Sequence, residues 1–309
     1  MSLRASLNKR PVIYEIVPPR RDTSRYQSEL RGVEDVLGDR RISAINVPEL
    51  TRRQEGKHLR YVPVTIPPEE YALMIKEYKE SVVNVIAPRL TRDEFLARAR
   101  RILSDYGIPN MVIVGKERRE DVLPGPGVPE ALGLLAPEKG PQALLGGICI
   151  FDRESVNTGE YGLENGPLTE AKRVRAKARA GCSFVTSQIS FDPAPVLRFL
   201  SAYQRLCEET GDDPVTVFIS LTTVQNASIL ALVESLDAVV PREVKRRLER
   251  ATHMGKASVE ASAEVFANVV SEAEKRNISV PLGLQVEQVG INSGELALEL
   301  LDRVYPSFR

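Results

Sequence analysis

Eight short apolar runs rich in β-branched residues divide the chain, and they constrain its fold more than any other feature. Most of them are hydrophobic almost throughout, without strict alternation. This pattern is typical of strands that are buried on both faces of a parallel sheet. The runs are Val12–Val17, Ile42–Val47, Val82–Ile86, Met111–Gly115, Leu145–Ile150, Ser183–Gln188, Val215–Ile219 and Leu282–Val286.

Amphipathic segments with helical spacing lie between these runs. Thr91 is a plausible N-cap for the first, and Gly181 and Gly211 follow two others as stop signals. Strands that alternate with helices predict a single (β/α)8 TIM barrel with extended loops, in which residues 1–309 form one domain and residues 1–11 a flexible N-terminus. The pattern alone leaves a doubly wound open sheet as an alternative. The predicted helices are Asp93–Tyr106, Leu168–Ala180, Pro193–Glu209 and Glu295–Val304.

Two segments are longer than a minimal barrel needs. Thr51–Tyr78 is polar and basic, and Glu117–Gln142 is rich in proline and glycine. Long loops in compact domains usually carry function or move. The second segment follows the fourth predicted strand, so we expect it on the face of the barrel where catalytic residues gather.

The charge balance and hydropathy exclude several classes of protein. Lys plus Arg and Asp plus Glu each number 42, so the net charge is zero, which argues against nucleic acid as a partner. No apolar run reaches 18 residues, so we expect no membrane span. Met1–Pro11 is basic but no hydrophobic segment follows it, which argues against a signal peptide and predicts a cytoplasmic protein.

The cysteines and histidines indicate neither a disulfide framework nor a metal site. Cys149, Cys182 and Cys207 form no CxxC pair, so we interpret them as small buried residues in a reducing compartment. His58 and His253 are the only histidines. They are too few for a His-rich metal site, and they argue against a Ser-His-Asp triad.

Polar residues at the ends of the predicted strands are the first candidates for chemistry in a barrel. Glu15 interrupts the first apolar run. A carboxylate there is costly unless it is paired, hydrogen-bonded or protonated, and protonation would make it a general acid. The structural alternative is a salt bridge to Arg20 or Arg89.

Two further strand ends carry carboxamide or carboxyl groups. Gln188 offers donors and an acceptor in one plane, which suits the edge of a heterocycle, or it caps the barrel as a satisfied polar residue. Glu287 and Gln285 share a face of the last strand, so either could point into the barrel mouth or have a structural role.

No glycine pattern indicates a phosphate site. Gly146-Gly147 and Gly125-Pro126-Gly127 match neither GxGxxG nor a P-loop. The basic segment Lys172–Arg179 would suit phosphates or carboxylates, but it also fits a solvated helix face.

Several segments resemble the methylenetetrahydrofolate reductase family, in the same order along the chain. Tyr14–Arg20 resembles the opening strand of that family, a Glu followed by Pro-Pro-Arg, and Ala87–Thr91 is similar to its Ala-Pro-His-Leu-Thr. Ala180–Asp192 resembles its Ala-Gly-Ala and Thr-Gln segments with the Phe-Asp that follows. Ile291-Asn292 resembles a Leu-Asn ending.

The resemblance implies a (β/α)8 barrel that uses FAD to pass a hydride from NADH or NADPH to 5,10-methylenetetrahydrofolate. Glu15 would be the general acid near N10 of the folate. Gln188 would bind the pterin, with Phe191 beside it. Lys177 would lie close to the FAD phosphates, and Asn46 stands where the family has a threonine near the flavin.

The chain departs from the family at flavin-side positions. Arg89 replaces a flavin-contacting His, and Gly115-Lys116 replaces Gly-Asp. Phe151 takes the place of a flavin-side tyrosine, and the loop Arg153–Gly159 differs from the family's Glu-Val-His-Pro. At three further positions this chain also differs. Ala227 replaces an aromatic residue that stacks on the substrate in the family, and Arg173 and Ala176 replace polar residues that contact FAD.

These observations favour a methylenetetrahydrofolate reductase-like protein that binds reduced folate and reduces 5,10-methylenetetrahydrofolate. The substrate-binding candidates are Gln188, Glu287, Asn46, Arg89 and Phe191, and the cofactor-binding candidates are Lys177, Gly115, Lys116 and Phe151. No metal is expected.

The alternatives left open are a flavin-free protein that binds 5-methyltetrahydrofolate and an unrelated barrel enzyme, such as an aldolase acting through Lys116. A homo-oligomer or a protein partner from the one-carbon pathway is also left open.

Overall fold

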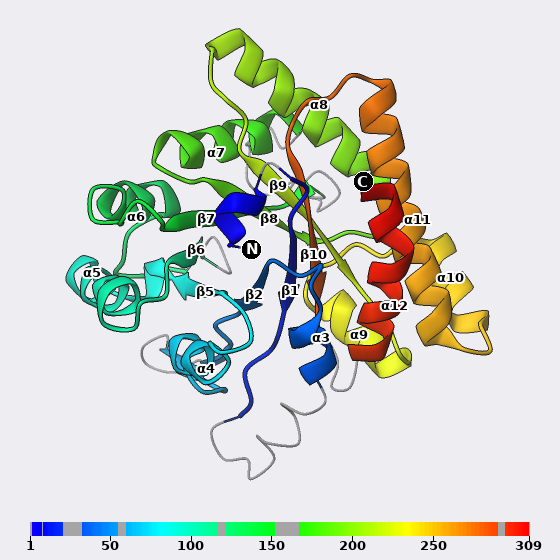
Figure 1. The fold of residues 1–309 in the computed structure, drawn as a ribbon, viewed down its shortest axis with the longest axis horizontal. Coiled ribbons are helices and arrows are strands. Elements are labelled where there is room, and N and C mark those ends of the chain that lie inside the picture. The colour runs from blue at the N-terminus through cyan, green and yellow to red at the C-terminus, as the bar shows by residue number, and fades with distance from the viewer. Residues whose placement is uncertain are drawn as a thin grey trace.

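The computed structural model describes residues 2–7, 9–20, 33–54, 60–116, 121–151, 167–289 and 294–308. Eight parallel strands close into a barrel in the order β1-β10-β9-β8-β7-β6-β5-β2 (Figure 1). Because β1 pairs with both β2 and β10, the open sheet is excluded and the predicted TIM barrel is confirmed. The strands are β1 (Val12–Glu15), β2 (Ala44–Val47), β5 (Ser81–Ile86), β6 (Asn110–Val114), β7 (Leu144–Cys149), β8 (Phe184–Ile189), β9 (Thr216–Thr222) and β10 (Leu282–Glu287).

Helices surround the barrel and follow the local signals of the sequence. Thr91 and Glu94 form a capping box at the start of α5. Asp192 caps α8, which ends at Gly211 in the left-handed conformation. The helices are α3 (Glu34–Gly38), α4 (Pro68–Met74), α5 (Arg92–Arg100), α6 (Val128–Leu135), α7 (Pro167–Arg179), α8 (Pro193–Thr210), α9 (Ala227–Ser235), α10 (Arg242–Arg250), α11 (Met254–Lys275) and α12 (Gly294–Val304), with a π-helical turn, Arg101–Asp105, after α5.

The amino-terminal half of the barrel interior is apolar. Phe184 and Phe218 meet edge to face with ring centroids 5.5 Å apart. Gly146 and Gly283 lie against these rings, and a Cβ on either glycine would come within 2.5 Å of ring carbons, so only glycine fits there. The same interior cluster contains Leu3, Ile13, Ala44, Val82, Val112 and Leu144.

A short helix, α1 (Leu3–Ser6), closes this end of the barrel (Figure 1). The Leu3 side chain is fully buried in the interior cluster. The Glu80 carboxyl accepts from the Leu3 N–H at 2.8 Å and from Asn110 Nδ2 at 2.7 Å. The segment that the sequence presents as a flexible N-terminus is therefore helical and packed over residues 3–6.

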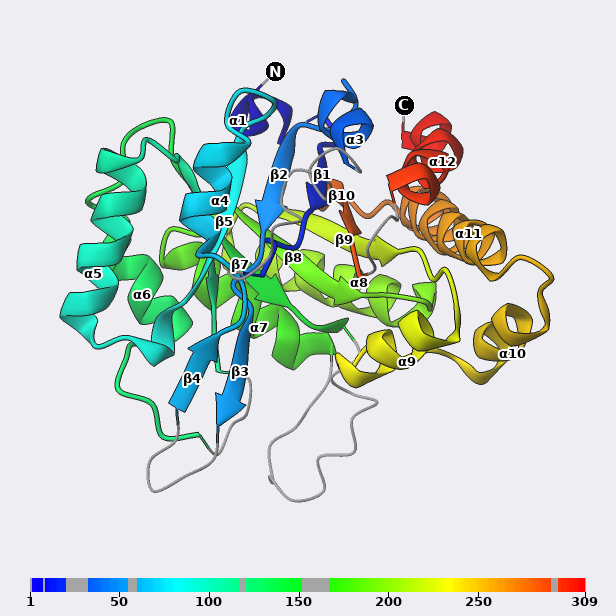
Figure 2. The same cartoon turned by 90° about the horizontal axis from the view of Figure 1, so that it is seen from below.

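The two long segments contain structure that the sequence does not signal. Thr51–Tyr78 holds an antiparallel ribbon, β3 (Thr51–Gln54) and β4 (Arg60–Pro63), followed by α4. Figure 2 shows this ribbon at the end of the barrel opposite α1. The described part of Glu117–Gln142 contains α6. Over the described residues, no helix has the length and hydropathy to cross a membrane.

Candidate functional site

The barrel interior becomes polar toward the carboxyl ends of its strands. Side chains two positions apart on a strand face the same side. Four strands have a residue in the interior cluster, namely Ile13, Ala44, Val82 and Phe218. The residue two positions later on each strand therefore also faces the interior, and these residues are Glu15, Asn46, Asn84 and Ser220. The polar residues therefore gather at the mouth, where TIM-barrel enzymes place their active sites.

Glu15 and Glu287 stand opposite each other on neighbouring strands. Asn46 Nδ2 donates to Glu15 Oε2 at 2.6 Å. Gln285 Nε2 donates to Glu287 Oε1 at 3.0 Å and to Glu15 Oε2 at 3.4 Å. Thus the Gln285 carboxamide links the two carboxyl groups, and Asn46 binds Glu15 alone. Both carboxamides belong to buried residues, whereas Glu15 and Glu287 are partly exposed.

The site favours protonated carboxyl groups. Burial raises the pKa of Glu15 well above its ordinary value, and the charge of Glu287 raises it further, although the Asn46 hydrogen bond lowers it. Burial also raises the pKa of Glu287 to about 7, against hydrogen bonds from Ser220 and Gln285 that lower it. A carboxylic acid with such a pKa can donate a proton near neutral pH.

The salt bridge that the sequence left open for Glu15 does not form with Arg89. Within the described residues, the hydrogen-bond partners of Glu15 are Asn46 and Gln285. The guanidinium of Arg89 lies over the Tyr61 ring, 3.7 Å from its centroid, and donates to Thr51 Oγ1. Arg89 therefore fastens the β3–β4 ribbon.

Lys116 joins the same network near the ribbon. Its Nζ donates to the backbone oxygen of Asp121 at 2.8 Å, and the Tyr61 hydroxyl donates to the Asp121 carboxyl. The neighbouring Gly115 has the Val128 side chain 3.3 Å from where its Cβ would lie. Asp121, which is buried, and Tyr61, which is partly exposed, were not predicted, because both lie in segments without a regular apolar pattern.

Gln188 and Phe191 lie beside α9 and α10, the two helices inserted between β9 and α11. Gln188 Nε2 donates to the backbone oxygen of Leu236, after α9. Phe191 is buried with Leu230 and Leu248 in a separate apolar cluster. Gln188 is thus held at the mouth, whereas Phe191 packs beneath these helices.

The residues at the flavin-side positions of the resemblance are engaged elsewhere. Lys177 is 9% exposed and donates to the Ile148 backbone oxygen, and its side chain lies against Gly147. Phe151 is buried, with its ring centroid 5.1 Å from that of Phe199 on α8. Within the described residues, the side chains of Lys177 and Phe151 are therefore both engaged in contacts inside the protein. The loop Arg153–Gly159 and Ile291-Asn292 lie outside the described residues.

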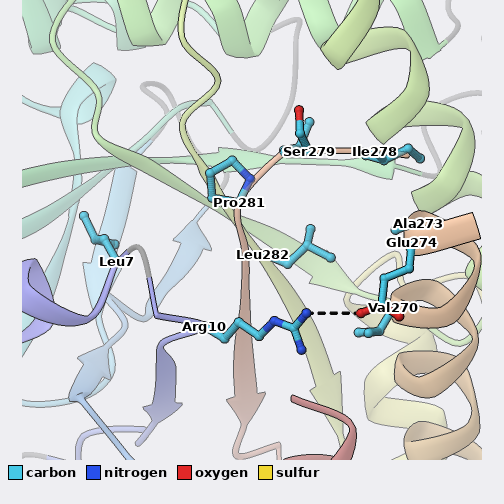
Figure 3. A pocket seen from close by; sticks show the side chains of 10 residues that line it. Leu7, Arg10, Val270, Ala273, Glu274, Ile278, Ser279, Pro281 and Leu282 are labelled. Carbon is cyan, nitrogen blue, oxygen red and sulfur yellow. Dashed lines mark hydrogen bonds and ion pairs between the residues drawn. The ribbon is translucent and has the colours of Figure 1, made fainter. Parts of the chain in front are cut away.

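A cavity of about 410 Å³ lies at the other end of the barrel, between the N-terminal segment, α11 and the start of β10 (Figure 3). Its lining is mostly aliphatic. Arg10 Nη2 pairs with Glu274 Oε1 at 3.2 Å on one side of it. We place the candidate site at the mouth because the carboxyl pair lies there.

The fold and site define a (β/α)8 barrel with a carboxamide-linked carboxyl pair at its mouth. No protein-family model matches the chain, and no curated protein matches its sequence. Solved structures do match the fold. An uncharacterized protein from Clostridium thermocellum that binds two copies of 5-methyl-5,6,7,8-tetrahydrofolic acid superposes with a TM-score of 0.74 at 20% identity, over 99% of both chains. The spore cortex-lytic enzyme SleL of Bacillus cereus gives a TM-score of 0.53 at 10% identity, over 96% of this chain and 74% of that one.

Proposed function

We propose that this protein binds a reduced folate at the mouth of the barrel, beside Glu15 and Glu287. The observation that carries the proposal is the pair of neighbouring carboxyl groups that Gln285 bridges, with Asn46 as a second donor to Glu15. Two further lines support it. The Clostridium thermocellum protein of like fold binds 5-methyltetrahydrofolate, and Glu15 and Gln188 match folate-side residues of the methylenetetrahydrofolate reductase family.

The chemistry we propose at this site is acid-assisted opening of 5,10-methylenetetrahydrofolate. Glu15 gives its proton to N10 as the bond between N10 and the methylene carbon breaks, and an iminium forms at N5. Hydride from an external donor, such as a reduced nicotinamide, then reaches that carbon and gives 5-methyltetrahydrofolate. The raised pKa of Glu15 supports this role, because a general acid must be protonated at working pH.

A second candidate function is binding of 5-methyltetrahydrofolate without flavin chemistry. The positions of Lys177 and Phe151 favour it, because both side chains are engaged in packing or hydrogen bonds that a flavin would have to displace. Such a protein would hold a methyl carrier or pass it to a protein partner, and it would need no electron donor.

Isothermal titration calorimetry with 5-methyltetrahydrofolate tests the proposal. We expect saturable binding to the wild type and weaker binding to Glu15→Gln. Arg10→Ala, which alters the cavity at the opposite end, serves as the control and should bind like the wild type. No binding of any reduced folate would overturn the proposal. Turnover of 5,10-methylenetetrahydrofolate, with and without added FAD, then separates the reductase from the binding protein.

A further inference from the structure

The carboxamide of Gln285 donates hydrogen bonds to two carboxyl groups at once. Its Nε2 donates to Glu287 Oε1 at 3.0 Å and to Glu15 Oε2 at 3.4 Å. Glu15 and Glu287 are register partners on β1 and β10, and adjacent strands lie about 4.8 Å apart. Two acidic groups are therefore held side by side by the sheet itself.

Among the residues that the structure describes, the side chains that contact this pair are neutral. Asn46 of β2, Ser220 of β9 and Gln285 of β10 hydrogen-bond to the carboxyl groups, and Thr222 of β9 donates to the backbone oxygen of Glu287. All of these side chains are neutral. Across the parts of the chain that the structure describes, no Lys, Arg or His forms an ion pair with Glu15 or Glu287, and the charge that acts on Glu15 is that of Glu287. Like charges this close cannot both form without a large penalty.

We infer that Glu15 and Glu287 act as one acid–base unit that holds a single proton near neutral pH, with Gln285 as its bridge and Glu287 as the positioning residue for Glu15. One member is a carboxylic acid and the other a carboxylate, so the unit presents a donor and an acceptor together. The two groups then titrate as a pair, and the proton count belongs to the unit as a whole.

This unit has a consequence for the ligand, and that consequence rests on the proposed function. When the acid gives its proton to a ligand nitrogen, the O–H bond breaks, the N–H bond forms and both carboxylates are left charged. The repulsion between them then favours the return of a proton from solvent. Glu287 would therefore keep Glu15 protonated until the ligand binds and would favour its reprotonation between ligands.

Infrared titration of the ligand-free protein in D2O tests the inference. Carboxyl groups with ordinary pKa values are ionised near neutral pH, so the C=O stretch of a protonated carboxyl reports on groups with a raised pKa, such as this pair. We expect this band in the wild type. In Glu287→Gln, the midpoint at which Glu15 loses its proton should fall by about one pH unit or more. Glu138→Gln, which removes an exposed carboxyl paired with Arg100, should leave the band unchanged.

Gln285→Leu provides a second test that keeps both carboxyl groups. Loss of the bridging donor should move both midpoints to higher pH, because hydrogen bonds from Gln285 favour the ionised forms. Circular dichroism checks that each variant is folded.

A wild-type spectrum without a protonated-carboxyl band, or an unchanged Glu15 midpoint in Glu287→Gln, would overturn the inference. Both measurements are made without folate, so they stand apart from the proposed function. Folate binding without the band would overturn the proton-sharing unit alone.

Discussion

Asn46 donates a hydrogen bond from Nδ2 to Oε2 of Glu15 across 2.6 Å, the shorter of the two bonds that reach this carboxyl from the described residues. The two residues are register partners on β1 and β2. A single-residue shift in that register would turn Asn46 away from the interior. The closed barrel thus sets the proton affinity of Glu15 through the pairing of its strands.

Asn46→Leu should raise the pKa of Glu15 further, because it removes a donor that favours the carboxylate. Infrared titration of the protonated carboxyl measures the midpoint. Asn84→Leu is the matched control, since Asn84 also faces the interior but makes no hydrogen bond to Glu15. Equal midpoints in the wild type and Asn46→Leu would contradict the role given to this bond.

Glu287→Gln should be more stable than the wild type above neutral pH. The folded-state pKa of Glu287 is about 7, against an ordinary 4.5. Between these values the folded state holds a proton that the unfolded chain has lost, so wild-type stability falls as pH rises through this window. Glu287→Gln has no carboxyl to ionise at this position, so its free energy of unfolding should exceed that of the wild type by up to about 3 kcal/mol. Urea unfolding of both proteins at about pH 5 and about pH 8 measures this advantage. If the variant and the wild type differ in free energy of unfolding by the same amount at both pH values, the raised pKa of Glu287 is contradicted.

Arg98→Met should destabilise the fold by about 3 kcal/mol, because it leaves two partly buried carboxylates without their cation. Arg98 pairs with Glu49 at 2.9 Å and with Glu69 at 2.8 Å, which ties α5 to the loop after β2 and to α4. Arg100→Met, on the same helix, removes an exposed pair with Glu138 and should change stability little. Similar urea midpoints for the two variants would argue against the network.

Leu3→Ala tests whether α1 is part of the barrel. Its side chain is fully buried in the interior cluster, so the cavity left behind should cost about 2–5 kcal/mol of unfolding free energy. Leu232→Ala, at a position 42% exposed, should have only a small effect. If the two variants unfold at the same urea concentration, Leu3 does not contribute to the core in solution.

The barrel strands were predictable because burial on both faces makes them apolar throughout. Each predicted run overlaps one observed strand. The β3–β4 ribbon was missed because its strands lie outside the barrel and carry charged side chains. The N-terminal helix was missed as well, because four residues are too few to show a helical period. The burial of Leu3 depends on the closed barrel, which the local sequence does not show.

The site was predictable only in part. Glu15 and Glu287 stand out as acids within apolar strands, and closure of the barrel brings the first and last strands together. The hydrogen bonds from Asn46 and Gln285 depend on the register of three strands, which the sequence does not specify. The contacts of Lys177, Phe151 and Arg89 depend on packing against residues far away in the chain.

The most direct test of the central claim is a crystal structure of the protein with 5-methyltetrahydrofolate. We expect the pterin at the carboxyl ends of the strands, with a ring nitrogen within hydrogen-bond distance of Glu15 or Glu287. A ligand ordered only in the cavity beside Arg10, or crystals soaked at saturating concentration without ordered ligand, would contradict it.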